Sequence, residues 1–190
     1  MWNDTLDRFA QTRSIVMGTH INIKMIAFDV DGTLTNGKLY ENENGELYKQ
    51  FHVHDGLMLS LAHSIGIKTG LITGRNSPIV KARGKELNMD FVLLGVKNKV
   101  KAMEELKSKY NLSWEEIAYM GDDLNDLNLL EKVAFSGCPK NAREENKKIC
   151  DFISEYEGGN GAAREFIEKI LKAQNLWETA LNKFKEITEA

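Results

Sequence analysis

The chain has 190 residues, of which 42% are apolar and 28% charged, and its formal net charge is −3. This length favours one domain with a sizeable core, and the charge excludes the basic surface typical of nucleic-acid binding. No apolar run approaches the roughly 18 residues of a membrane-spanning helix. The first residues lack the apolar core of a secretory signal, and two cysteines match neither a zinc spacing nor a disulfide framework. We therefore expect a cytoplasmic protein with no nucleic-acid or membrane partner, its single domain covering residues 23–190 after an N-terminal extension, 1–22.

Apolar runs alternate with helical patterns along most of the chain. Strands are expected at residues 23–28, 67–73, 90–95, 116–122, 133–136 and 151–153, because each is a short apolar run that ends in polar residues or glycine. Helices are expected after the capping residues Asp55 and Ser77, over 98–110, and as one long helix over 161–187. This order predicts an α/β fold, a Rossmann-like three-layer sandwich with a central parallel sheet.

One segment interrupts the alternation directly after the first strand. Residues 38–53 contain two extended patterns, with Asn44-Gly45 between them as the predicted turn of a β-hairpin. We expect this hairpin to project as a small flap. A second irregular stretch, Gly158-Gly159-Asn160-Gly161, allows two interpretations: a phosphate cradle, or, as we favour, a flexible turn leading into the last helix.

The stretch Asp29-Val30-Asp31-Gly32-Thr33 ends the first strand with two carboxylates. Residues i and i+2 of a strand face the same way, so Asp29 and Asp31 are placed to address one ligand. Gly32 permits a sharp turn and keeps a β-carbon out of the site. Taken alone, the stretch fits a ligand site no better than it fits a polar turn or a helix cap.

Other strand ends carry matching chemistry. The second strand ends in Thr73-Gly74-Arg75, whose hydroxyl and free N–H groups suit a phosphoryl group, and Lys99 begins a helix further on. The fourth strand ends in GDDLND, which brings Asp122, Asp123 and Asp126 to the same edge. Parallel sheets bind ligands at the carboxyl ends of their strands. Several carboxylates there repel one another unless a cation lies among them, and all-oxygen ligands indicate Mg²⁺.

This ordered set of motifs resembles the haloacid-dehalogenase superfamily of phosphatases, and the resemblance covers nearly the whole chain. DVDGTLTNG, NGELYKQFHVHDG, LITGRNS, KNKV, AYMGDDLNDL and GGNGAAREF together are similar to the 3-deoxy-D-manno-octulosonate (KDO) 8-phosphate phosphatase group. The resemblance implies a fold without a cap domain, dependence on Mg²⁺ and a homotetramer. It implies hydrolysis of a small acidic sugar phosphate through an aspartyl-phosphate.

The resemblance also implies residue roles. Asp29 is the expected nucleophile, and Asp31 the expected acid and base. The metal ligands implied are a carboxylate oxygen of Asp29, the backbone carbonyl of Asp31 and the carboxylate of Asp122. The expected contacts with phosphate and substrate are Asp31, Thr73, Gly74, Arg75 and Lys99. The expected supporting residues behind them are Thr33, Asp123, Asn125 and Asp126. Two residues, His54 and Asn76, are expected at the pocket rim.

The spacing of the motifs leaves no room for a lid domain, so the flap is the only wall the chain itself offers. We expect a neighbouring subunit to supply the rest of the active-site wall. Two other functions remain open: hydrolysis of a nine-carbon sialic-acid-type 9-phosphate, and a non-catalytic oligomerisation domain linked to sugar-nucleotide synthesis. The non-catalytic alternative is disfavoured because the chain keeps the complete set of Asp29, Asp31, Thr73, Lys99 and Asp122.

Overall fold

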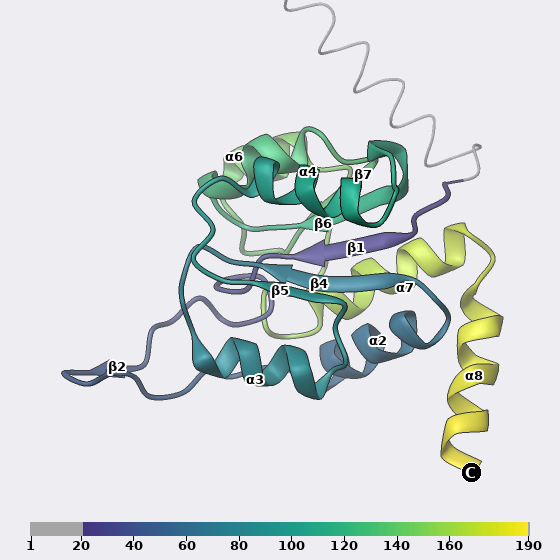
Figure 1. Cartoon of the computed structure of the whole chain (residues 1–190), viewed down its shortest axis with the longest axis horizontal. Coiled ribbons are helices and arrows are strands. Elements are labelled where there is room, and N and C mark those ends of the chain that lie inside the picture. Colours follow the sequence, from purple (N-terminus) through teal and green to yellow (C-terminus); the bar gives the residue numbers. More distant parts are fainter. Residues whose placement is uncertain (1–20, 190) are drawn as a thin grey trace, which may run out of the picture.

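The computed structural model describes residues 21–189; residues 1–20 of the predicted extension, and Ala190, lie outside this range. Its centre is a six-stranded parallel sheet in the order β5-β4-β1-β6-β7-β8 (Figure 1). The strands are β1 (Met25–Phe28), β4 (Lys68–Ile72), β5 (Phe91–Leu93), β6 (Ile117–Met120), β7 (Phe135–Cys138) and β8 (Phe152–Ile153). The predicted parallel sheet is confirmed. Five strands are one to three residues shorter than the sequence suggested, and β7 keeps its predicted length but lies two residues later.

Helices cover both faces of this sheet, which confirms the three-layer sandwich. On one face lie α2 (Val53–Ser64), α3 (Pro78–Glu86), α7 (Ala162–Ala173) and α8 (Trp177–Glu189). The other face carries α4 (Lys99–Lys109), α5 (Leu127–Leu130) and α6 (Glu144–Ile149), with the short helices η1 (Trp114–Glu116) and η2 (Leu124–Asp126) at the ends of β6. The residues of β1 alternate between the two apolar clusters: Ile26 and Phe28 face one, Met25 and Ala27 the other.

The described residues contain no separate domain between β1 and β6, so the fold has no cap. The predicted flap is present as β2 (Glu41–Asn42) and β3 (Gly45–Glu46), and it projects from the body of the molecule (Figure 1). Its turn lies one residue earlier than predicted, because Asn42 pairs with Gly45 and leaves Glu43 and Asn44 as the turn residues.

Two helix predictions need correction. The chain over 161–187 forms two helices rather than one, because Asn175 adopts a left-handed conformation (φ 57°) that ends α7 before Trp177 begins α8. Helix α2 begins at Val53, and its N-cap is His52, so Asp55 does not cap this helix. The Asp55 carboxylate instead accepts hydrogen bonds from the backbone N–H groups of Gly161 and Arg164, at 3.3 and 2.8 Å, and so caps α7.

Ser77 caps a helix as the sequence predicts, and Asn98 caps another. The Ser77 hydroxyl accepts from the N–H of Val80, at 3.2 Å, and the Asn98 carbonyl oxygen accepts from that of Lys101, at 2.9 Å. Asn98 thereby fixes the start of α4, with Lys99 as its first residue.

Candidate active site

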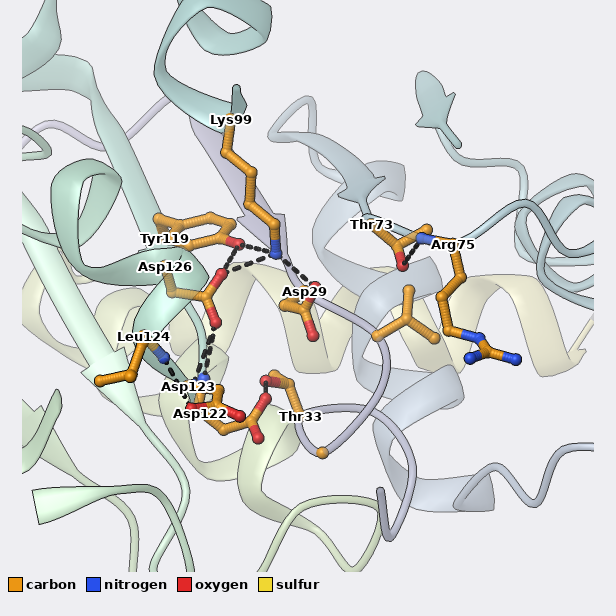
Figure 2. A network of polar contacts seen from close by, with 12 residues as sticks. Asp29, Thr33, Thr73, Arg75, Lys99, Tyr119, Asp122, Asp123, Leu124 and Asp126 are labelled. Carbon is orange, nitrogen blue, oxygen red and sulfur yellow. Dashed lines mark hydrogen bonds and ion pairs between the residues drawn. The ribbon is translucent and has the colours of Figure 1, made fainter. Parts of the chain in front are cut away.

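Asp29 lies directly after β1, at the carboxyl edge of the sheet. Its side chain is almost wholly buried, and its N–H donates to the carbonyl of Met120 in the neighbouring strand, at 2.9 Å. Lys99 reaches the same point from the start of α4 and forms an ion pair with Asp29 Oδ1 (Figure 2). The end of β1, held by its neighbour β6, and the start of α4 therefore bring together a carboxylate and an ammonium that are 70 residues apart in sequence.

Asp126 holds the Lys99 ammonium from the other side. Its Oδ1 accepts from Lys99 Nζ at 2.7 Å and from the Tyr119 hydroxyl at 2.6 Å, while Lys99 also donates to that hydroxyl at 3.1 Å (Figure 2). Asp126 Oδ2 accepts from the N–H groups of Asp122 and Asp123, at 3.0 and 3.2 Å. Asp126 thus fixes both the lysine and the backbone of the acidic loop. Sequence reasoning missed Tyr119, whose one signal is a polar-tipped aromatic in an otherwise apolar strand.

Asp122 faces the loop that follows β1. The Thr33 hydroxyl donates to Asp122 Oδ1 at 2.8 Å. Gly32 has φ 102°, and a β-carbon at this position would overlap the Asp122 carboxylate. The glycine of the DVDGT stretch is therefore needed both for its backbone conformation and for the close approach of the second acid.

Three carboxylates and one ammonium make this buried cluster strongly acidic. One oxygen each from Asp29, Asp122 and Asp126 lies within 4.8 Å of the others. Burial raises the pKa of Asp29 to about 8 against the opposing effect of Lys99, and burial with the nearby Asp126 raises that of Asp122 to about 7. Burial alone would lower the pKa of Lys99, but Asp29 and Asp126 raise it, so we assign it the charged form. The raised pKa values show that full ionisation is unfavourable here without a cation, because three ionised carboxylates and one ammonium would leave two negative charges unbalanced. An all-oxygen donor set of this kind fits a divalent cation such as Mg²⁺.

The loop after β4 supplies the groups suited to a phosphoryl ligand. Thr73 is buried, and its hydroxyl accepts from the Arg75 N–H at 3.3 Å. The Arg75 side chain, which is 43% exposed, pairs with Glu41 on the flap. Gly74 and Asn76 are exposed at the surface of this loop, where Asn76 packs against Gly95.

Asp31 pairs with a different lysine from Asp29. Its carboxylate is partly exposed and forms an ion pair with Lys49, which comes from the flap. Lys49 also pairs with Glu46 Oε1 at 2.9 Å. Sequence reasoning missed Lys49 and Glu46, because no local pattern links the flap to the DVDGT stretch.

The other residues named from the sequence lie around this centre. Asp123 is exposed, and its side chain accepts from the N–H of Leu124 at 2.8 Å, while Asn125 is exposed on η2. His54 is exposed on the first turn of α2, its ring 4.9 Å from that of His52, and it lines an open pocket with residues of α7. Arg83 on α3 pairs with Glu86 at 2.8 Å.

The glycine-rich stretch before α7 does not form a phosphate cradle. Gly158 N–H donates to Asn141 Oδ1 at 2.9 Å, Gly159 N–H to the Thr33 carbonyl at 3.0 Å, and Asn160 N–H to the Glu157 carbonyl at 3.0 Å. The stretch packs on the DVDGT loop so closely that a β-carbon at Gly158 would overlap the Gly32 carbonyl. It braces that loop, and is neither the cradle nor the flexible turn.

Comparisons with known proteins agree with this geometry. A profile of haloacid dehalogenase-like hydrolases matches residues 91–166. The KDO 8-phosphate phosphatase KdsC of Escherichia coli K12 is 35% identical over 159 residues, which are 84% of this chain and 85% of that protein. The Haemophilus influenzae KdsC is 35% identical over 169 residues, 87% of this chain and 94% of that protein. The chain belongs to the KDO 8-phosphate phosphatase family of haloacid dehalogenase-like hydrolases.

Solved structures show the same relationship. The KDO 8-phosphate phosphatase of Moraxella catarrhalis, in complex with magnesium, phosphate and KDO, superposes with a TM-score of 0.84 at 36% identity, covering 92% of this chain and 98% of that one. A probable YrbI family phosphatase from Pseudomonas syringae also gives 0.84, at 35% identity over 92% of this chain and 97% of that one. The protein is therefore a phosphoric monoester hydrolase of the sugar-phosphate type. No helix in residues 21–189 has the length and apolar character to cross a membrane.

Proposed function

We propose that this phosphatase hydrolyses KDO 8-phosphate, or a closely similar acidic sugar phosphate, in a Mg²⁺-dependent reaction through an aspartyl-phosphate on Asp29. The observation that carries the proposal is the buried Asp29–Lys99 ion pair at the sheet edge, with Asp122 beside it. A relative with the same fold was solved with magnesium, phosphate and KDO.

Asp29 is the proposed nucleophile, and one of its oxygens attacks phosphorus. Lys99 and the Thr73 hydroxyl bind the phosphoryl oxygens, together with the backbone N–H group of Gly74. The carboxylates of Asp29 and Asp122 and the carbonyl of Asp31 would hold Mg²⁺, which neutralises the charge that otherwise repels an anionic substrate.

Asp31 is the proposed acid and base. It protonates the leaving sugar oxygen as the phosphoryl group is transferred, and then removes a proton from the water that cleaves the aspartyl-phosphate. Its partly exposed carboxylate lies on the flap side of the site, where the sugar would sit. Arg75, half-exposed beside the flap, is the group we propose for the carboxylate of the sugar acid.

A homotetramer is the proposed assembly, with a neighbouring subunit completing the active-site wall. The support comes from the flap, which exposes about half of each of the Leu39, Leu47 and Tyr48 side chains (49%, 54% and 53%). The Tyr48 ring stacks on Tyr40, with ring centres 4.4 Å apart. Such an exposed aromatic surface is typical of a protein interface. A monomer with full activity on its sugar phosphate would contradict this assembly.

The test is phosphate release from a panel of sugar phosphates, measured with Mg²⁺ and with EDTA. The panel contains KDO 8-phosphate, a nine-carbon sialic-acid-type 9-phosphate and neutral hexose phosphates. We expect the highest kcat/KM on KDO 8-phosphate, loss of turnover with EDTA, and loss of turnover in Asp29→Asn. The mechanism fails if Asp29→Asn retains turnover, and the substrate assignment fails if a neutral hexose phosphate is preferred.

A further inference from the structure

We propose that Lys49 is a positioning residue for Asp31: it fixes the direction of the carboxylate that exchanges protons with the leaving group and with water. Lys49 follows β3 on the flap, whose residues are mostly exposed. Its own side chain is nevertheless only 3% exposed. A lysine that is buried on an exposed flap has given up hydration of its ammonium, so its contacts with protein groups determine where it lies.

The contacts of Lys49 are two carboxylates. Its ammonium donates to Asp31 Oδ1 and pairs with Glu46 Oε1 at 2.9 Å. Among residues 21–189, Asp31 Oδ2 receives no hydrogen bond from another side chain or backbone group. Lys49 therefore occupies one oxygen of Asp31 and leaves the other available for the sugar oxygen or for water.

Glu46 connects Lys49 to the loop after β4, residues 73–77, which we call the phosphate loop. Its second oxygen, Oε2, accepts from the hydroxyl of Ser77. Ser77 is buried and caps α3, four residues after Thr73. A chain of polar contacts thus runs from the phosphate loop through Ser77, Glu46 and Lys49 to Asp31, so the position of the flap and the direction of the acid are coupled.

This role rests on the proposed function, because it assumes that Asp31 protonates the leaving group. It goes beyond that function in assigning a flap residue to the proton-transfer step. A residue that only held the flap, which walls the sugar, would raise KM for the sugar phosphate and leave kcat near that of the wild type. A residue that positions the acid matters most for substrates whose leaving group needs a proton.

The experiment compares two leaving groups in Lys49→Met, in which the stem keeps a similar length and the charge is lost. One substrate is the sugar phosphate that the wild type hydrolyses best, and the other is p-nitrophenyl phosphate, whose phenolate departs without a proton. We measure kcat and KM separately, and their ratio covers the reaction up to departure of the leaving group and excludes hydrolysis of the aspartyl-phosphate. A loss carried by KM alone would overturn the role in proton transfer, because it would show that Lys49 only holds the flap against the sugar. We expect Lys49→Met to lose about 10- to 100-fold on the sugar phosphate and no more than about 3-fold on p-nitrophenyl phosphate.

Three further variants make the result specific. Lys38→Met removes an exposed flap lysine, whose side chain makes no hydrogen bond or ion pair within residues 21–189, and is expected to match the wild type on both substrates. Lys49→Arg, which retains a donor, is expected to recover part of the loss. Asp31→Asn is the reference, and its own loss is expected to be larger on the sugar phosphate.

The outcomes separate the two proposals. Equal losses on both substrates, or no loss on either, in Lys49→Met would overturn the role of Lys49 while Asp31→Asn still shows the leaving-group dependence. If Asp31→Asn itself lacks that dependence, the proposed proton transfer by Asp31 fails, and the role of Lys49 fails with it.

Discussion

The Tyr119 hydroxyl is the part of the buried network that can be removed with the least change in shape. Tyr119→Phe keeps the ring, which is fully buried, and deletes one donor to Asp126 and one acceptor for Lys99. Burial, with Asp126 and Asp29 nearby, raises the pKa of Tyr119 well above its usual value, so its hydroxyl remains a donor. The variant therefore tests hydrogen bonding to charged groups rather than packing.

The magnitude follows from what remains. A hydrogen bond to a charged group contributes about 1.5–3 kcal/mol, and Tyr119 makes two. Lys99 keeps Asp29 and Asp126 as partners, and Asp126 keeps Lys99 and two backbone N–H groups, so part of this loss is compensated. We expect the free energy of unfolding to fall by about 2–4 kcal/mol, which lowers Tm by about 5–15 °C in a domain of this size. Looser placement of Lys99 on Asp29 is expected to reduce kcat/KM about 10-fold, or about 1.4 kcal/mol.

The assays are thermal unfolding and phosphate release, with Tyr110→Phe as the matched control. The Tyr110 hydroxyl donates to the backbone carbonyl of Asp90 at 3.1 Å, outside the acidic cluster, so its loss is expected to cost about 1 kcal/mol and leave kcat/KM unchanged. If Tyr119→Phe has the Tm of Tyr110→Phe and the activity of the wild type, the hydroxyl does not organise Lys99 and the reasoning is wrong.

Two other predictions concern the brace behind the active site and the far end of the sheet. Gly158→Ala places a methyl group against the Gly32 carbonyl, so we expect about 1–3 kcal/mol of destabilisation and a clear loss of phosphatase activity, measured by unfolding and phosphate release; unchanged activity would show that the DVDGT loop does not need this contact. Burial alone would raise the pKa of Asp90, but Lys68, the Thr69 N–H and His63 lower it below 3.8, so its ionised form stabilises the fold above that pH and this contribution is lost as the pH falls through the lowered pKa. Asp90→Asn is expected to lower the stability at pH 7 by about 1–2 kcal/mol, and this difference from the wild type should shrink below about pH 4 in thermal unfolding; a gap that widens in acid would contradict the sign.

Sequence reasoning predicted the parallel sheet because strand ends and helix caps are written locally. Ser77 before Pro78 is a short-range signal whose effect does not depend on the rest of the fold. The same locality allowed Asp29, Thr73, Lys99 and Asp122 to be named together, since each stands at the end of an apolar run or the start of a helix. Their proximity follows from parallel topology alone.

The errors arose where distant contacts decide local structure. Glu41 and Glu46 face each other across the flap, an arrangement that two like charges disfavour in an isolated hairpin. Arg75 pairs with Glu41, while Ser77 and Lys49 bind Glu46. These contacts accompany a hairpin register in which Asn44-Gly45 is not the turn, although this pair has the higher turn propensity. The helix break at Asn175 was missed because of a local pattern: the apolar periodicity continues across the break.

Asp55 explains why the flap is anchored firmly where it returns to the core. It stands in the first turn of α2, just after the flap, yet its carboxylate caps the N-terminus of α7 at Gly161 and Arg164. The residues immediately before that terminus, Gly158 and Gly159, pack on the DVDGT loop. The end of the flap, the start of α7 and the loop that carries Asp31 are thereby joined through one buried carboxylate. Glu46 and Lys49 lie on the flap before this anchor, and their contacts with Ser77 and Asp31 are a second connection between the flap and the reacting groups.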